Sequence, residues 1–388
     1  MKTEYLSDVM QAWRRDFHQH PELGFQEHRT SAKVAELLTE FGLEVHERVG
    51  GTGVVGVLQR GNGPRAIGLR ADMDALPIHE QNGFAYRSVN DGVMHACGHD
   101  GHTTMLLGAA RHLAEKGDFS GRAVFIFQPA EEHGQGGPAM LADGLFDRFP
   151  VDEVYGMHNM PGMELGSFAT RTGAMMASEA LFEIEIHGQG GHAAMPHRGV
   201  DAIVVGAEIV SALQTIVSRK LNPGLNGVVS VTDFSTDGQR NVLPGRATLS
   251  GDARALNRDT NLEIERAMRQ IVEGVCMAHG VKGTVKYETI FEVLVSAPEP
   301  TLKAARCAAS LAGERRVDTE YPPILASEDF AHMAKARPGC FMLVGNGTQA
   351  AHSRPLHSAD FDFNDKLLVP GSSFWVSLVE QELHGEGA

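Results

Sequence analysis

The stretch LFEIEIH, residues 181–187, alternates strictly between apolar and polar side chains. Phe182, Ile184 and Ile186 fall on one face of an extended segment, whereas the other face carries two glutamates and a histidine. A period of two with one apolar face predicts a β-strand that is buried on one side and solvated on the other. This strand separates two parts of the chain that follow different patterns.

The segments after this strand predict a small α+β domain. Helices are expected at about 201–220 and 259–279, and strands at 227–234, 247–254 and 284–293. Strand, helix, strand, strand, helix, strand is the order of the split βαβ, ferredoxin-like arrangement. We therefore expect an inserted domain over residues 181–291. Its apolar run AIVVGAEIVSALQTIV contains Glu208 and predicts a buried helix rather than a membrane span.

The chain on either side of the insertion alternates helices with apolar strands. Strands are predicted at 53–58, 66–70, 123–127 and 153–158, and a helix from about His102 to Lys116. This alternation is typical of an α/β domain around a mixed, mainly parallel sheet. We expect one discontinuous domain made of residues 1–180 and 292–388.

Composition limits the classes of partner. The 388 residues include 49 acidic and 34 basic side chains, a formal charge of −15, which argues against nucleic acid or an anionic membrane as partner. The first residues lack the pattern of a secretory signal, and the four scattered cysteines are typical of reduced thiols. A cytoplasmic location is the expectation.

Ligand-type side chains gather in one short loop and after several predicted strands. The loop MHACGHDGH, residues 94–102, contains three histidines, a cysteine and an aspartate. In open α/β sheets, sites form beyond the carboxyl ends of strands. The residues that follow predicted strands there are Asp72, Asp74, Glu131, Glu132, His158 and His357.

Each of these residues also has a structural interpretation. Cys97 could be an inert buried thiol, and Asp100 is expected to cap the helix that begins near His102. Adjacent glutamates on a loop are usually solvated. The common placement of so many ligand types at one sheet edge nevertheless favours a metal site.

Longer blocks of the sequence resemble the zinc-peptidase-like amidohydrolases, a family that includes hippurate hydrolases, aminoacylases, auxin-conjugate hydrolases and N-acetyl-diaminopimelate deacetylases. The matching blocks extend over nearly the whole chain. They are DFHQHPELGFQE (16–27), RADMDALPI (70–78), MHACGHDGHTTMLLGAA (94–110), FQPAEE (127–132), GMHNMPG (156–162), GGHAAMPH (190–197), SEDFA (327–331) and LHSADFDFND (356–365).

The resemblance implies a site for two divalent metal ions per subunit. The matching ligand positions are Cys97, His99, Glu132, His158 and His357. Thiolate, imidazole and carboxylate donors suit Zn or Mn, with Ni and Co as alternatives. The resemblance also implies a zinc-peptidase-like catalytic domain with an inserted domain that acts as a lid and dimerises the chain.

The same resemblance assigns catalytic roles. Glu131 is the implied general base, which takes a proton from metal-bound water and returns it to the departing amine. On an extended segment Glu131 and Glu132 would point in opposite directions. Asp74 is expected to orient a ligand imidazole through its second nitrogen.

The inserted domain is expected to complete the site. His192, flanked by glycines in GGHAAMPH, matches the family histidine that stabilises the oxyanion, often across a dimer interface. Asn241 and Arg254 are candidates for holding a substrate carboxylate, although Arg254 could equally be a structural ion-pair partner.

These residues predict a metal-dependent amidohydrolase that acts on a small-molecule N-acyl amino acid and forms a homodimer or a homotetramer. A dipeptidase or carboxypeptidase of the same fold is the alternative. Two further alternatives are a thiol hydrolase that uses Cys97 and a binding protein that retains metal without turnover.

Overall fold

The computed structural model describes residues 1–349 and 351–384. The chain divides into two compact units. Unit 1 contains Met1–Met175, Val295–Pro322 and the chain from Glu328 onward. Unit 2 contains Met176–Leu294 and the short segment Pro323–Ser327. Unit 2 therefore begins and ends a few residues outside the expected 181–291 and includes a segment that the sequence did not suggest.

Unit 1 is built on an eight-stranded mixed sheet. Its three central strands, β4, β3 and β5, are parallel to one another, and β5 continues in parallel with β16. The antiparallel pairs are β1 with β2, β2 with β4, and β6 with β16. In sheet order the strands are β1 (Glu44–Val49), β2 (Gly53–Arg60), β4 (Gly121–Gln128), β3 (Ala66–Asp72), β5 (Glu153–Pro161), β16 (Gly339–Gly347), β6 (Phe168–Ala169) and β15 (Val317–Asp318).

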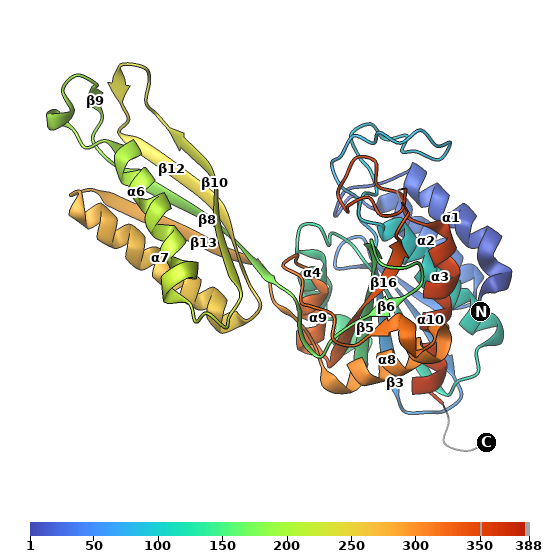
Figure 1. Ribbon diagram of the computed structural model, residues 1–388. Helices are drawn as coiled ribbons and strands as arrows, with labels where there is room; N and C mark the ends of the chain where they lie inside the picture. The colour runs from blue at the N-terminus through green and yellow to red at the C-terminus, as the bar shows by residue number, and fades with distance from the viewer. Residues whose placement is uncertain (350, 385–388) are drawn as a thin grey trace. The chain divides into compact units, whose positions relative to one another are not determined.

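Helices cover both faces of this sheet, as the ribbon diagram in Figure 1 shows. One face carries α1 (Ser7–Gln19), α2 (His28–Glu40), α3 (His99–Lys116), α8 (Pro298–Ala312) and α10 (Leu368–Glu382). The other face carries α4 (Gly136–Ala142), α5 (Leu145–Arg148) and α9 (Phe330–Ala336). Because both faces of the sheet are covered, the strand sequences are continuous apolar runs and do not alternate between apolar and polar residues.

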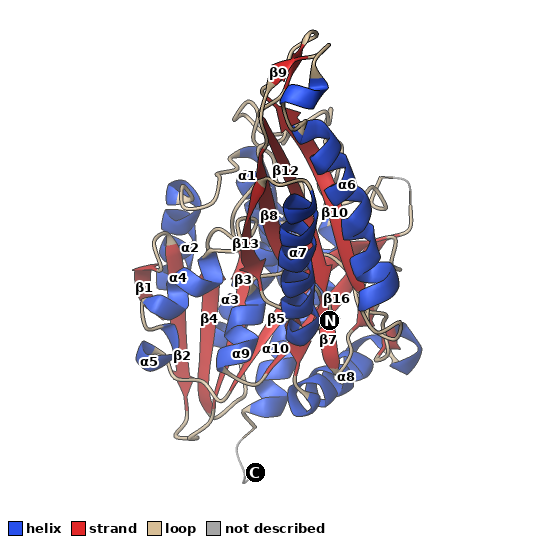
Figure 2. Ribbon diagram, turned by 90° about the vertical axis from the view of Figure 1, so that its left-hand side faces the viewer, coloured by secondary structure: helices blue, strands red, loops and turns tan. Residues whose placement is uncertain are grey.

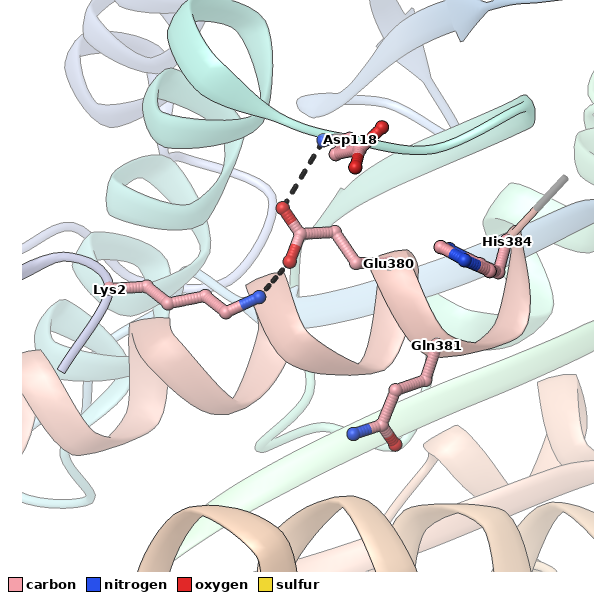
Figure 3. A pocket seen from close by; sticks show the side chains of 5 residues that line it. All are labelled: Lys2, Asp118, Glu380, Gln381 and His384. Atoms are coloured by element: carbon pink, nitrogen blue, oxygen red, sulfur yellow. Dashed lines mark hydrogen bonds and ion pairs between the residues drawn. The ribbon is translucent and has the colours of Figure 1, made fainter. Parts of the chain in front are cut away.

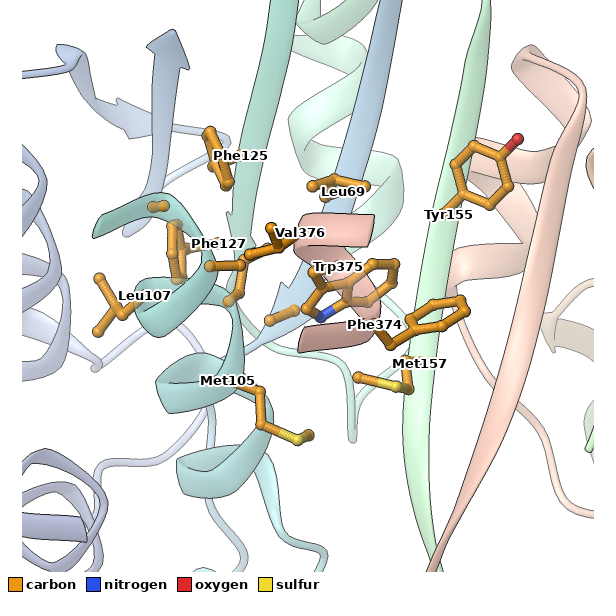
Figure 4. Packing of buried hydrophobic residues seen from close by; sticks show 14 of the residues in the cluster. Leu69, Met105, Leu107, Phe125, Phe127, Tyr155, Met157, Phe374, Trp375 and Val376 are labelled. Atoms are coloured by element: carbon orange, nitrogen blue, oxygen red, sulfur yellow. The ribbon is translucent and has the colours of Figure 1, made fainter. Parts of the chain in front are cut away.

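The core of unit 1 lies between the sheet and the helix pair α3 and α10. Leu69, Phe125 and Phe127 project from the strands and pack with Met105 of α3 and Trp375 of α10, all buried (Figure 4). Aromatic and aliphatic side chains of this size contribute about 1.5–3 kcal/mol each when they are fully buried. This packing fixes α3, whose first residue belongs to the candidate site.

Unit 2 is a four-stranded antiparallel sheet in the order β10-β12-β8-β13, with two helices on one face (Figure 2). This is the strand order of the split βαβ arrangement. The alternation of LFEIEIH is reproduced, because Phe182, Ile184 and Ile186 are buried under the helices. The elements are β8 (Ser178–His187), α6 (Ala202–Thr215), β10 (Gly227–Thr236), β12 (Arg246–Ala255), α7 (Arg258–Ala278) and β13 (Lys282–Phe291).

Within the described residues, one helix, Ala202–Lys220, is long and apolar enough to cross a membrane. Its buried side chains, among them Val205, Ile209 and Leu213, pack into the core of unit 2. The sequence predicted a buried helix, but only one side of it is buried, because Ile203, Val204 and Val217 are exposed.

Two small pairs of strands complete the fold. β9 (Gly191–His192) pairs with β11 (Val242–Leu243) beyond the main sheet of unit 2. β7 (Gly173–Met176) pairs with β14 (Leu294–Ser296) where the chain passes between the units.

Candidate metal centre

The predicted ligands of unit 1 meet at the carboxyl edge of the parallel strands. Asp74 follows β3, Glu131 and Glu132 follow β4, and His158 lies near the end of β5. These strands are parallel neighbours, so their carboxyl ends open at the same edge. The loop 94–98 leads into α3 beside them, with His99 as the first residue of the helix.

Five side chains form two overlapping groups whose ligand atoms lie within 4.8 Å of one another. Cys97, His99 and His158 form one group, and Cys97, Glu132 and His357 form the other. The Cys97 Sγ lies 3.4 Å from His158 Nε2, and His357 Nε2 lies 3.4 Å from Glu132 Oε1. Cys97 is the residue that the two groups share.

The imidazoles of His99 and His158 are held so that the same nitrogen, Nε2, faces the other ligand side chains. His99 Nδ1 donates to Asp74, at 2.9 Å from the backbone oxygen and 3.1 Å from Oδ1. His158 Nδ1 donates to the backbone oxygen of Asn159 at 2.7 Å. In both rings Nε2 is left facing the other ligands, which is how metal-binding histidines are oriented in proteins.

Unpaired polar atoms test whether these residues fit a metal. His99 Nε2 and Glu132 Oε1 are buried and have no hydrogen-bond partner among the described residues. A buried polar atom without a partner costs about 1–3 kcal/mol. Both atoms belong to the ligand groups, and a divalent cation would satisfy them together. The residues present therefore fit a metal site.

The electrostatics of the cluster point the same way. Burial, followed by the charges of Glu132 and Glu131, raises the pKa of the Cys97 thiol well above its ordinary value. Burial alone would lower the pKa of His99, but the charge of Asp72 and the hydrogen bond to Asp74 outweigh it and raise the pKa to about 10. The site is thus rich in negative charge, which a bound cation offsets.

Asp74 joins two of the ligands. Its Oδ1 accepts from the ring of His99, and its Oδ2 accepts from the backbone N–H of Glu132 at 3.0 Å. The side chain is buried. This is the position expected of a residue that orients a ligand imidazole, and it also fixes the loop of Glu132.

Glu131 is buried beside a second acidic group. Its carboxylate lies within 4.8 Å of ligand-type atoms of Glu328 and Asp329, and also within that distance of His99 and Glu132. Burial, and then the charge of Glu328, raises the pKa of Glu131 well above its ordinary value. Burial and the neighbouring acidic side chains both favour the neutral form of this carboxyl.

The segment of these two glutamates is not extended, contrary to the expectation from the sequence. Ala130 has a positive φ of 49°, and residues 131–134 form a turn in which Gly134 N–H donates to Glu131 O. The two carboxylates consequently lie close together, with ligand oxygens within 4.8 Å of each other, rather than pointing in opposite directions. His357 likewise has a positive φ, 64°, and such strained residues are common at functional sites.

The helix of the opening loop begins at His99, three residues earlier than expected. Gly98 precedes it in the left-handed region, with φ at 96°, and a Cβ there would lie 2.3 Å from Asn159 Oδ1. Asp100 consequently sits in the first turn of α3 and does not cap it. Its carboxylate instead binds Arg14 at 2.9 Å and His18 at 2.8 Å.

The third histidine of the loop, His102, has both ring nitrogens engaged by other side chains. His102 Nδ1 lies 2.6 Å from Asp72 Oδ1, and its Nε2 lies 2.7 Å from Asn159 Oδ1. Both ring nitrogens are used, so His102 connects β3 to the end of β5 behind His158. The family resemblance assigned a ligand role to His99 of this loop and none to His102.

The sequence analysis did not single out Arg70, which is buried beside the site. Arg70 donates to Gln128 at 2.9 Å, to Asp72 at 2.7 Å, to Glu328 at 2.8 Å and to Asp329 at 3.0 Å. Asp72 is close to Arg70 in the sequence, whereas Gln128 and the pair Glu328 and Asp329 come from two distant parts of the chain. The block SEDFA was visible in the sequence, but nothing there connected it with Arg70.

The remaining predicted residues lie in unit 2. His192 and Asn241 are exposed neighbours, because β9 and β11 pair Val242 with His192, and Asn241 O accepts from Ala193 N–H at 3.1 Å. Arg254 lies near the far end of β12 from Arg246, which pairs with His187. The structure of unit 2 does not bring Arg254 together with Asn241.

A surface hollow elsewhere in unit 1 contains none of these residues. It measures about 420 Å³ and lies beside α10. The Lys2–Glu380 ion pair crosses it, and Glu380 also accepts from Asp118 N–H at 3.3 Å (Figure 3). Its lining residues are Lys2, Asp118, Glu380, Gln381 and His384. Of these groups, Lys2, Glu380 and the backbone N–H of Asp118 pair with one another.

Comparison with known proteins agrees with this geometry. Residues 68–381 match the model of peptidase family M20/M25/M40. The chain is 40% identical over 365 residues to a hippurate hydrolase of Campylobacter jejuni, covering 94% of each protein. It is 38% identical to thermostable carboxypeptidase 2 of Saccharolobus solfataricus, covering 92% of this chain and 91% of that protein.

A solved structure shows the same architecture. The YXEP protein of Bacillus subtilis, described as a dinuclear metal binding peptidase from the M20 family, superposes with a TM-score of 0.84 at 30% identity. The match covers 98% of this chain and 99% of that one. From the family match, the extent of the sequence identity and the shared fold, the chain belongs to peptidase family M20/M25/M40.

Proposed function

We propose that this protein hydrolyses the amide bond of N-acyl amino acids with two divalent metal ions. The observation that carries the proposal is the pair of donor groups that share Cys97, with the buried carboxyl of Glu131 beside them. The relatives named hippurate hydrolase and N-acyl-L-amino acid amidohydrolase support this substrate class.

The ligands would be Cys97, His99, Glu132, His158 and His357. A donor set of one sulfur, imidazole nitrogens and a carboxylate suits Zn or Mn, and Ni and Co are alternatives. When bound, the ions supply positive charge that acidifies water and polarises the carbonyl of the substrate. Asp74 keeps the ring of His99 in the orientation that presents Nε2 to the ligand cluster.

Glu131 carries the proton. As the water oxygen attacks the amide carbon, the Glu131 carboxylate accepts a proton from that water. When the C–N bond breaks, Glu131 returns the proton to the amine nitrogen, and the products are a carboxylic acid and a free amino acid. A carboxyl whose pKa is raised by burial and by Glu328 suits both steps.

Unit 2 would supply groups that act on the substrate. His192 is proposed to donate a hydrogen bond to the oxyanion that develops at the amide carbonyl. Asn241, its neighbour across β9 and β11, would bind the carboxylate of the amino acid. Unit 2 would thus act as the lid of the site.

The same unit would form a homodimer. Strand β10 lies at an edge of its sheet, and an edge strand can pair with a second copy of the chain. Beside it, Phe234 on β10 and Ile203 and Val204 on α6 are exposed apolar side chains. Light scattering distinguishes the dimer from a monomer or a tetramer. The four buried, unpaired cysteines are in keeping with a cytoplasmic location.

The alternatives differ in the weight of their support. A carboxypeptidase of the same fold is favoured by the 38% identity to thermostable carboxypeptidase 2. A thiol hydrolase is disfavoured, because burial raises the pKa of Cys97 and a neutral thiol is a poor nucleophile.

The test is hydrolysis of a substrate panel before and after chelation. The panel contains N-benzoylglycine, N-acetyl amino acids, N-acetyl-diaminopimelate, an indoleacetyl amino acid, a dipeptide and an N-blocked peptide with a free carboxyl end. We expect turnover of N-acyl amino acids that stops with chelator and returns with Mn or Zn. Preference for the peptides would support the carboxypeptidase instead, and turnover that survives chelation would support the thiol mechanism.

A further inference from the structure

His357 is held differently from the other two imidazoles of the metal centre. His99 lies at the start of α3 and His158 lies on β5, and each has its Nδ1 fixed by a hydrogen bond. His357 lies on a loop, and its side chain is 52% exposed. Among the described residues no hydrogen bond holds its ring, whereas its backbone N–H donates to Ala96 O at 2.8 Å. The position of the His357 ring therefore depends on how its loop is anchored.

A buried arginine on α1 anchors that loop. The guanidinium of Arg14 is fully buried, and its Nε donates to Asp100 Oδ2 at 2.9 Å. Its Nη1 donates to Asp365 Oδ1 at 3.2 Å, and its Nη2 donates to Asp362 Oδ1 at 3.5 Å. Asp100 belongs to the first turn of α3, whereas Asp362 and Asp365 belong to the segment that follows His357. One side chain thus joins the start of α3 to the His357 loop, residues 357–365.

An aromatic ring of the same loop packs against the same place. Phe363 is buried, and the guanidinium of Arg14 lies 5.6 Å from the centre of its ring. The ring also lies against Gly101 of α3, where a Cβ would be 2.2 Å from Phe363 Cε2. A glycine at this position allows the close approach of the ring to the helix. The His357 loop is therefore attached to α3 by ion pairs and by packing.

We propose that Arg14 is a positioning residue that fixes the His357 loop and so completes the donor group of Cys97, Glu132 and His357. The proposal rests on the proposed function, because it takes these three residues as metal ligands. Arg14 lies behind the loop and acts on the ligand His357 through Asp362 and Asp365.

The other donor group, Cys97, His99 and His158, depends less on Arg14. Asp74 and the backbone of Asn159 hold its two imidazoles. In addition, Asp100 accepts from His18 Nδ1 at 2.8 Å, so the first turn of α3 keeps a buried partner when Arg14 is changed. Loss of Arg14 should therefore weaken one of the two proposed metal positions more than the other.

Two variants disturb the anchor in different ways. Arg14→Lys keeps a buried positive charge for Asp100, but a single ammonium group cannot also serve Asp362 and Asp365 from separate directions. Phe363→Leu leaves Arg14 in place and removes the ring that packs on α3, so it keeps the test decisive if Arg14→Lys does not fold. Arg111→Gln is the matched control, since Arg111 lies on α3 and pairs with Glu115 of the same helix.

The test is calorimetric titration of the metal-free full-length protein with Zn²⁺, which does not depend on turnover. His357→Ala serves as the reference variant, because it identifies the binding step that requires His357. We expect Arg14→Lys and Phe363→Leu to weaken that step about 10–100-fold, the usual effect of losing a residue that orients a ligand. The other step should change little, and Arg111→Gln should match the wild type in both steps. Thermal unfolding of each metal-free variant shows that it is folded.

Two results would overturn the proposal. Unchanged affinity at both steps in folded variants would show that the His357 loop does not need the anchor. Equal weakening of both steps would show that Arg14 supports the whole centre and has no particular effect on His357. If the wild-type protein bound two ions but hydrolysed none of the panel, the proposed function would fail, and the titration would still decide the role of Arg14.

Discussion

The metal centre of unit 1 and the pair β9 and β11 of unit 2 are built in opposite ways. At the metal centre, His99, Asp74 and Glu131 are buried, and each has its position set by neighbouring groups. His192 and Asn241 are exposed on two-residue strands. The difference teaches that one part of the proposed site is preorganised within a single unit, whereas the other part is carried on a surface that is free to meet a substrate.

The buried arrangement of the metal centre lowers the stability of the metal-free protein. Unpaired atoms such as His99 Nε2 and Glu132 Oε1 destabilise the metal-free fold. A divalent cation at the proposed site would satisfy both atoms and offset this cost. Exposed groups like His192 carry no such cost, and substitutions there should leave the fold and the metal intact.

The largest effect is expected for Glu131→Gln. Glutamine keeps the shape of the side chain but cannot take a proton, so kcat should fall about 10²–10⁴-fold. Metal content, measured by atomic absorption, should stay at the wild-type level because Glu131 is not among the proposed ligands. Glu47→Gln on the exposed face of β1 serves as the control. A variant with near-normal kcat would mean that another group is the base.

Substitution of His192 in the exposed pair β9 and β11 should lower kcat nearly as much as substitution of Glu131. His192→Ala should lower kcat about 10²–10³-fold, the usual effect of losing one oxyanion donor, with metal content and thermal unfolding unchanged. His187→Ala, an exposed histidine on β8, is the matched control. Mixing His192→Ala with Glu131→Gln chains tests sharing across a dimer, since recovered activity requires each chain to supply the residue that the other lacks.

Substitution of Asp74, which holds the ring of His99, should weaken metal binding more than it destabilises the fold. Asp74→Asn weakens the hold on His99 Nδ1 and the acceptor for Glu132 N–H. Metal affinity, measured by competition with a chelator, should fall about 10–100-fold. Equal affinity in the variant and the wild type would contradict the proposed orienting role, and a loss of fold in the metal-free protein would show that Asp74 is structural.

The fold beneath the metal loop should have a stability that depends on pH through His18. Burial and Arg14 lower the pKa of His18, but its hydrogen bonds to Asp100 and Glu80 outweigh them and raise it. The charged form therefore stabilises the fold fully below the ordinary pKa of about 6.5, and this contribution is lost as the pH rises through the raised value.

The His18→Gln variant tests whether the stabilisation by His18 decreases as the pH rises. It should be destabilised by about 3 kcal/mol at low pH, the usual effect of breaking a buried pair. The difference from wild type in urea unfolding should shrink as the pH is raised above the pKa of the folded state. A loss of stability that grows with pH would show that His18 is neutral in the native protein.

Much of the site follows from local sequence pattern. Cys97, His99, Glu132 and His158 stand at or just beyond strand ends or a helix start, and the carboxyl ends of parallel strands meet at one edge. The alternation in LFEIEIH likewise predicted a strand with one buried face, because side-chain period in a strand does not depend on distant residues.

The sequence pattern gave wrong predictions at two places where the backbone conformation depends on a particular residue nearby. The turn at Glu131 follows from the positive φ of Ala130, and the early start of α3 follows from Gly98 packed against Asn159. Neither is visible in hydrophobic periodicity. Both decide where a functional side chain points, so such errors fall at the site rather than in the core.

By itself, the sequence determined the α/β and α+β elements, the family and the ligand types, since these depend on periodicity, strand order and residue chemistry. Only the tertiary structure decided that His102 is hydrogen-bonded to Asp72 and Asn159, that Arg70 donates to Gln128, Glu328 and Asp329, and that segment 323–327 belongs to unit 2. The physical reason is that hydrogen-bond partners of a buried polar group are chosen by proximity in space, and residues far apart in the chain carry no local signal of it.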